Sequence, residues 1–105
     1  MDDKEFNRLA EATLARIEAA LEASNADLDF ELKAGGILEI EFADGSKIIV
    51  NRHGVAKEIW VAAKSGGFHF RHVGDSWADT RDGTELFAKL SALASLQAGE
   101  PIVLE

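Results

Sequence analysis

Carboxylates are the side chains of this sequence whose type and spacing could do chemistry. In residues 27–32, Asp27, Asp29 and Glu31 alternate with three apolar residues. Period-2 alternation is typical of a strand with one buried side, so the three carboxylates are expected to share the exposed side. Their oxygens are hard ligands, suited to iron, manganese, calcium or magnesium.

A second set of carboxylates precedes this strand. Glu11, Glu18 and Glu22 are spaced at i, i+7 and i+11, which places them on one narrow stripe of a helix. Nine acidic residues come before Lys33. We expect the helical stripe and the strand to form one continuous acidic surface.

Three interpretations of this acidic surface are open. It could serve solubility and protect an edge strand from aggregation. It could bind a cation, in a shallow and largely hydrated site, because the sequence has no EF-hand loop or other cage motif. It could also dock to a basic patch on another protein, which requires no metal geometry.

The distribution of charge limits the classes of partner. Residues 1–44 hold twelve of the nineteen acidic residues and four basic ones, so they account for the whole net charge of −8. Such a surface repels phosphate backbones and anionic lipids, so no nucleic-acid or membrane partner is expected. The acidic N-terminus, the lack of a long apolar run and the absence of Cys favour a cytoplasmic protein of one domain, residues 1–105.

No enzyme is predicted, and no organic cofactor. His69 and His72 are three residues apart on an expected strand, so they point to opposite faces and cannot chelate one ion together. No Ser lies in a nucleophile elbow, and no glycine pair forms a phosphate-binding loop. No pair of carboxylates is recognisable as a buried acid and base.

The elements that must position these residues follow from periodicity. Apolar residues at spacings of three and four predict helices over 3–24 and 83–97, the second capped by Asp82 and Glu85. Alternating segments predict strands at 28–33, 37–43, 46–51, 57–63 and 67–73, with a sixth candidate at 76–79. Asp44-Gly45 predicts a type I′ hairpin turn. Short connections make the strands antiparallel, and we expect an α+β, two-layer sandwich with both helices on one face.

Trp60 is expected on the opposite, open face of that sheet. If Ile59 and Val61 face the core, Trp60 points to solvent, beside residues such as Arg52 and Lys57. A half-buried Trp sheltered by long side chains is the ordinary interpretation. An aromatic side chain on an open sheet is also a typical anchor for protein contacts.

The sequence resembles the bacterial frataxin (CyaY) family. The resemblance covers essentially the whole chain and rests on motifs in one order and spacing: EFNRLAE at 5–11, GSKIIVN at 45–51, EIWVAAKSGGFHF at 58–70, TRDGTELFAKL at 80–90 and QAGE at 97–100. In the loop after Arg52, His53-Gly54-Val55 stand where the family usually has a Gln and then a Pro. Loss of that Pro is expected to loosen the loop.

The resemblance implies a frataxin-like fold and weak binding of Fe²⁺ or Fe³⁺ on an acidic ridge. The matching positions, which we call the acidic ridge, are Asp3, Glu11, Glu18, Glu22, Asp27, Asp29 and Glu31. It also implies partners: a cysteine desulfurase and an iron–sulfur scaffold protein. Trp60, Asn51 and Arg52 match partner-binding positions on the sheet, and Glu18 and Glu22 are expected to contact a partner as well as iron.

The leading hypothesis is an iron-binding adaptor or regulator of iron–sulfur cluster assembly that modulates the desulfurase, as a monomer. One alternative is an iron storage or buffering protein that needs no partner and forms iron-dependent oligomers. The other is an acidic docking module that never uses metal.

Overall fold

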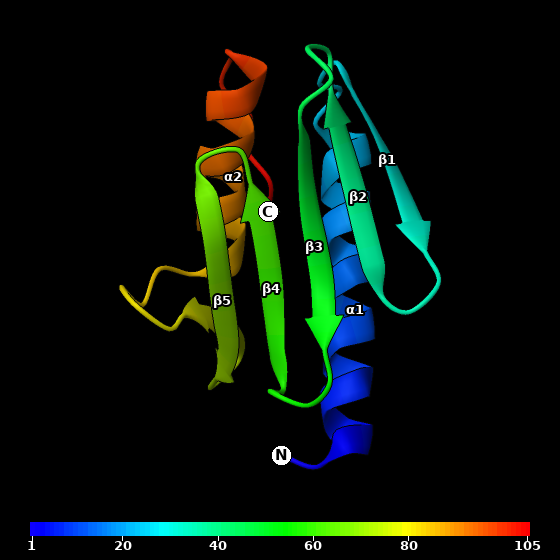
Figure 1. The fold of residues 1–105 in the computed structure, drawn as a ribbon, viewed down its shortest axis with the longest axis vertical. Coiled ribbons are helices and arrows are strands. Elements are labelled where there is room, and N and C mark those ends of the chain that lie inside the picture. Colours follow the sequence, from blue (N-terminus) through cyan, green and yellow to red (C-terminus); the bar gives the residue numbers. More distant parts are fainter.

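The computed structural model describes residues 1–105, which form two helices and six strands (Figure 1). The elements are α1 (Asp3–Ala23), β1 (Leu28–Lys33), β2 (Ile37–Phe42), β3 (Lys47–His53), β4 (Glu58–Ala63), β5 (Gly66–Val73), β6 (Ser76–Asp79) and α2 (Leu86–Ala98). Each strand pairs antiparallel with its neighbour in the sequence, so the sheet order is β1-β2-β3-β4-β5-β6. The predicted order of elements is confirmed, including the sixth strand. Neither helix is long and apolar enough to cross a membrane.

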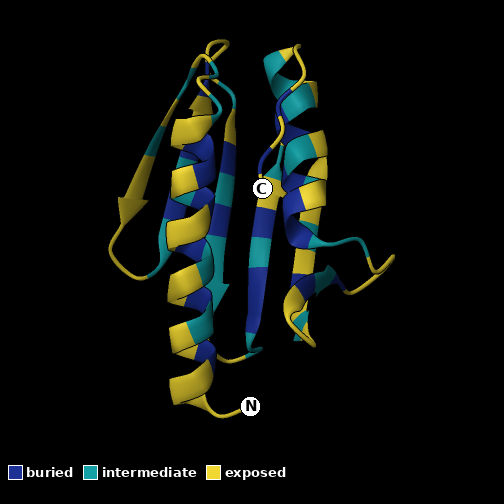
Figure 2. Ribbon diagram, turned by 180° about the vertical axis from the view of Figure 1, so that it is seen from behind, coloured by how far each residue is buried: buried dark blue, intermediate teal, exposed yellow.

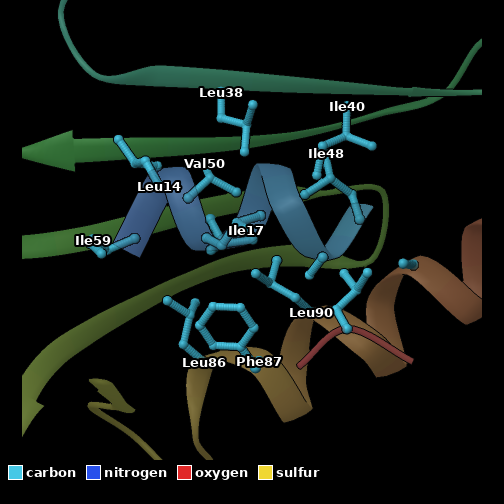
Figure 3. Close-up of a cluster of buried hydrophobic side chains, with 14 of the residues drawn as sticks. Leu14, Ile17, Leu38, Ile40, Ile48, Val50, Ile59, Leu86, Phe87 and Leu90 are labelled. Atoms are coloured by element: carbon cyan, nitrogen blue, oxygen red, sulfur yellow. The ribbon is translucent and has the colours of Figure 1, made fainter. Parts of the chain in front are cut away.

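Both helices cover the same face of the sheet, and the other face is open (Figures 1 and 2). Alternate residues of the strands point toward the helices and join a core of 22 buried apolar residues. Figure 3 shows Leu14 and Ile17 of α1 beside Ile48 and Val50 of β3, with Leu90 of α2 below them. Each fully buried side chain of this size stabilises the fold by about 1.5–3 kcal/mol. The predicted two-layer sandwich is confirmed.

The β2–β3 turn is a hairpin, but not of the predicted type. A type I′ turn needs a positive φ at both central residues, whereas only Gly45 has one (84°). The N–H of Gly45 donates to the carbonyl of Phe42, and the N–H of Phe42 donates to the carbonyl of Ser46, both at 2.9 Å. The loop therefore has three residues, Ala43 to Gly45, and Gly45 supplies the left-handed position of a bulge. Asp44 needs no strained backbone in this arrangement.

The second helix begins later than predicted. Its N-cap is Glu85, whose carboxylate accepts hydrogen bonds from the N–H groups of Phe87 (2.8 Å) and Ala88 (3.2 Å). Asp82 instead accepts from the N–H of Thr84 (2.9 Å), in the turn that precedes the helix. The predicted start near residue 83 is wrong because Asp82 stabilises the preceding turn, and only Glu85 caps the N-terminus of the helix.

The chain after α2 packs back on the molecule, a feature not predicted from the sequence. Ile102 and Leu104 are buried, while the residues between and beside them are exposed. The hydroxyls of Ser95 and Ser91 accept the N–H groups of Ile102 and Leu104, each at 2.8 Å. Ser91 and Ser95 are four helical residues apart, and Ile102 and Leu104 are two extended residues apart. Both spacings correspond to about 6 Å, so each hydroxyl meets one backbone N–H. Residues 101–105 are thus fixed along α2.

Candidate functional site

Among the helical residues of the acidic ridge, Glu11 lies beside the edge strand β1. Glu11 lines a hollow of about 380 Å³ together with Leu32 and Lys33 of β1. Glu18 and Glu22 follow on the same stripe, two and three turns nearer the end of the helix, after which β1 begins. The helical stripe therefore comes close to the first strand at Glu11.

Two residues of the acidic ridge are paired with bases. Asp3 lies 2.8 Å from the ammonium of Lys57, and a hydrogen bond from Lys57, reinforced by its charge, lowers the pKa of Asp3. Glu11 lies 3.2 Å from the guanidinium of Arg52. The remaining ridge carboxylates form no ion pair with any basic side chain: Glu18, Glu22, Asp27, Asp29 and Glu31. The ridge is therefore neutralised at one end and free along most of its length.

The strand part of the ridge points to the open face of the sheet. In β1 the apolar residues Leu28 and Phe30 pack against the core, so Asp29 and Glu31 face the other way. In register with them on β2 are Glu41 and Glu39, respectively. Like charges directly opposite each other on neighbouring strands are destabilising. Carboxylates thus occur on both sides of β1: Glu18 and Glu22 on the helix, Asp29 and Glu31 on the open face. The single continuous acidic surface expected from the sequence is therefore divided between two faces, because strand alternation turns Asp29 and Glu31 away from the helices.

Glu39 and Glu41 belong to this acidic region and were not predicted from the sequence. Glu39 accepts hydrogen bonds from the ammonium groups of Lys33 and Lys47, both at 2.9 Å. These two bonds lower the pKa of Glu39 to about 2. The signal was available, because Glu39 and Glu41 alternate with the buried Leu38 and Ile40 as the β1 carboxylates alternate with their neighbours.

The donor set of the ridge fits a loosely held cation rather than a caged one. Nowhere in residues 1–105 do three His, Asp or Glu side chains gather closely enough to hold one metal ion. Isolated carboxylates bind hard cations through one or two oxygens, with water completing the coordination. The arrangement can concentrate cations and basic surfaces along the β1 edge, and it offers no built coordination sphere.

Relief of repulsion in the ridge gives a testable expectation. The variant Glu18→Gln, Glu22→Gln, Asp29→Asn, Glu31→Gln removes four unpaired negative charges without removing an ion pair. We expect its melting temperature to rise by about 4 °C at low salt, and by less at high salt where the charges are screened. The control variant Glu5→Gln, Asp75→Asn, Glu100→Gln, Glu105→Gln changes net charge equally at scattered exposed positions. An equal rise in both variants, measured by circular dichroism, would show that local crowding of charge is not the cause.

Arg52 does not lie on the face predicted from the sequence. It was expected beside Trp60 on the open face, but it points to the helix side, where it contacts Glu11 and packs over Gly36. The physical reason is strand alternation: Arg52 has the same parity in β3 as the buried Ile48 and Val50. A partner on the open face therefore meets Asn51, which is in register with Trp60, and does not meet Arg52.

Trp60 lies on the open face as predicted and is half-buried there. Its ring is stacked between two imidazoles: the His53 ring lies 3.8 Å away at 12°, and the His69 ring 4.5 Å away at 8°. His53, which was expected in a loop, is the last residue of β3. Lys57 is not a neighbour of Trp60, since it pairs with Asp3. The two imidazoles, and not long side chains such as those of Arg52 and Lys57, therefore cover the ring of Trp60.

His69 and His72 point to opposite faces, as predicted. His69 stacks on Trp60 on the open face, whereas His72 packs edge-on against Trp77, whose ring is buried on the helix side. One ion cannot be held by both.

Glu58 is the buried carboxylate of the open face, with 6% of its surface exposed. One oxygen accepts the indole N–H of Trp60 and the other accepts Nε–H of Arg71, each at 2.8 Å. Burial acts to raise the pKa of Glu58, but the hydrogen bonds from Trp60 and Arg71 outweigh it, so the pKa lies below its usual value. Glu58 is thus a charged acceptor at neutral pH.

Comparison with known proteins supports one family over the whole chain. A family model described as a frataxin-like domain matches residues 1–100. An iron-sulfur cluster assembly protein CyaY from Dechloromonas aromatica (strain RCB) is 75% identical over 104 residues, which cover 99% of each chain.

Solved structures give the same answer for the fold. A frataxin from Psychromonas ingrahamii matches with a TM-score of 0.91 and 33% identity, covering 98% of this chain and 97% of its own. A trimeric frataxin from the yeast Saccharomyces cerevisiae, crystallised as a complex with ferrous iron, matches with a TM-score of 0.74 and 23% identity, covering 88% and 87% of the two chains. At that lower identity the likeness concerns the fold.

Proposed function

Because the chain belongs to the frataxin-like family, we propose that it acts in iron–sulfur cluster assembly as an adaptor or regulator. The observation that carries the proposal is the row of unpaired carboxylates on both sides of β1, from Glu18 and Glu22 to Asp29 and Glu31. Iron is the cargo in this proposal, held weakly by surface oxygens. The ferrous complex of the yeast frataxin is in keeping with it.

The ridge has two compatible uses. Its free carboxylates attract Fe²⁺ or Fe³⁺ and leave most of the coordination sphere to water. The same charges steer and hold a basic protein surface, and we propose that this surface belongs to the cysteine desulfurase. The open face around Trp60 and Asn51 then contacts the scaffold protein. No catalytic step is assigned to this chain.

Desulfurase turnover tests the proposal. Turnover by the desulfurase and scaffold is expected to change when the wild-type protein is added. Fourfold amide substitution at Glu18, Glu22, Asp29 and Glu31 is expected to remove most of that change. Substitution of Glu5, Asp75, Glu100 and Glu105 alters net charge by the same amount and is expected to preserve it. No change in turnover with wild-type protein, and no complex in a binding assay, would refute the adaptor role.

Iron titration separates the two uses of the ridge. If amide substitution weakens both iron binding and partner binding, the ridge serves both. Loss of partner binding with unaltered iron titration would identify a metal-independent docking surface. Iron-dependent oligomers that form without either partner, and no effect on turnover, would indicate storage instead.

A further inference from the structure

The orientation of Trp60 is fixed from three sides. His69 lies directly opposite Trp60 on β5, and His53 approaches from β3, so an imidazole from each neighbouring strand covers one face of the indole. Rings that stack across strands stand upright on the sheet. The indole therefore presents an edge to solvent, and neither of its faces is open.

Each of the two imidazoles has its own anchor. Nδ1 of His53 accepts the backbone N–H of Ala56 at 3.2 Å, which ties the ring to the loop after β3. Nδ1 of His69 lies 3.6 Å from a carboxylate oxygen of Glu58. The oxygen involved is the one that also accepts the indole N–H of Trp60.

Glu58 connects these groups. It lies two residues before Trp60 on the same strand and the same face, so its carboxylate reaches the indole N–H without distortion. Its second oxygen is held by Arg71. A charged acceptor forms a stronger and more directional hydrogen bond than a neutral one. A half-buried indole that lost this acceptor would leave its N–H unpaired or turn it toward solvent.

We propose that Glu58 is a positioning residue for Trp60: it holds the indole upright between His53 and His69, so that a docking partner meets the edge of the ring and not its face. This inference rests on the proposed function of the open face as a scaffold contact. The edge of the indole is then the part of Trp60 that a partner can contact, because both ring faces are covered by imidazoles. A partner that stacks on the indole must first displace an imidazole.

A pre-oriented ring binds more tightly because less rotational freedom is lost on docking. Loss of the Glu58 hydrogen bond is therefore expected to weaken scaffold binding by about fivefold, without removing any partner contact of Trp60 itself. Arg71 is the matched control, because it contacts Glu58 but does not donate to or stack on Trp60.

NMR of the whole protein tests the orientation directly. The wild-type protein is expected to show nuclear Overhauser effects from the Trp60 indole to ring protons of both His53 and His69. Glu58→Gln retains a carbonyl oxygen for the indole N–H and is expected to keep these signals. Glu58→Leu has no acceptor and is expected to lose them, and Arg71→Gln is expected to keep them. Scaffold affinity, measured by calorimetry, should fall about fivefold only for Glu58→Leu.

Several results would overturn the inference. One is a wild-type indole that shows no contact with one of the imidazoles; this measurement needs no variant and holds even if Glu58→Leu does not fold. Another is a Glu58→Leu protein that keeps the stacked signals. A third is additivity: if Glu58→Leu and Trp60→Phe weaken scaffold binding independently, Glu58 does not act through Trp60. Absence of scaffold binding by the wild-type protein refutes the proposed function at this face, while the NMR signals still decide the orientation.

Discussion

Removal of residues 101–105 is expected to lower the free energy of unfolding by about 4 kcal/mol. Ile102 and Leu104 are 5% and 2% exposed, and burial of each side chain stabilises the fold by about 1.5–3 kcal/mol. Truncation also leaves the hydroxyls of Ser91 and Ser95 without the backbone N–H groups that they accept. Since a domain of this size has a stability of about 5–15 kcal/mol, the truncated protein is expected to be near the limit of folding. Urea unfolding followed by circular dichroism measures the loss.

Point variants separate burial from chain length in this prediction. Leu104→Ala is expected to cost about 2–3 kcal/mol, because it empties a buried position. Val103→Ala is the matched control: Val103 is 68% exposed, so its substitution should leave the urea midpoint unchanged. Ser91→Ala and Ser95→Ala each leave a backbone N–H unpaired and are expected to cost about 1 kcal/mol. A truncated protein with the wild-type midpoint would show that the tail does not stay docked in solution.

Lys89→Met is expected to destabilise the fold by about 3 kcal/mol at pH 7. Lys89 of α2 lies 3.2 Å from Asp79, the side chain of which is 2% exposed, and 3.0 Å from Asp82. Methionine keeps the apolar stem of Lys89 but leaves the buried Asp79 charge without its cation, and breaking a buried pair costs about 3–5 kcal/mol. Lys64→Met is the control: Lys64 is 70% exposed and 3.9 Å from Asp44, so its loss should be almost neutral.

A second substitution checks the cause. Asp79→Asn in the Lys89→Met background removes the unpaired charge, so the double variant is expected to recover part of the lost stability. A double variant that is less stable than Lys89→Met would mean that packing of Lys89, and not the unpaired Asp79, explains the effect.

The pH dependence of the same variant follows from the pKa values of the two carboxyl groups. Burial acts to raise the pKa of Asp79, but hydrogen bonds from the Arg81 N–H and Lys89 outweigh it, so the pKa lies below 3.8. Hydrogen bonds from Thr84 and Lys89 lower the pKa of Asp82 to about 2. Groups with a lowered pKa stabilise the fold above their unfolded value, near 4, and this contribution is lost as pH falls toward 2. The stability difference between wild type and Lys89→Met should therefore shrink between pH 4 and pH 2.

Regular periodicity made most of the fold predictable. The alternation of buried and exposed residues in β2, β3 and β4 and the apolar stripe of α1 each set one face toward the core. Short connections then left few topologies. What failed were features that depend on single backbone angles. The φ of Asp44 decided the turn type, and the conformation between Asp82 and Glu85 decided where α2 begins.

The candidate site was predictable in part, and for identifiable reasons. The ridge carboxylates follow from spacing, and Glu39 and Glu41 would have followed from the same rule applied to β2. Arg52 was wrongly expected on the same face as its neighbour Asn51, although adjacent residues of a strand point to opposite faces. The stack of His53, Trp60 and His69 joins three strands. Rotamers set such contacts, and no pattern in the sequence displays them.

The order of strands in the sheet has a consequence for how the chain folds. Because every strand pairs with its neighbour in sequence, any hairpin can form early with little loss of loop entropy. The helices, by contrast, are the first and last elements of the chain, and each can bury its apolar side only after the sheet has formed. We expect the antiparallel strands to pair first and α1 and α2 to pack on the sheet last. Protection of backbone amides from hydrogen exchange is expected to be highest in the central strands β3 and β4.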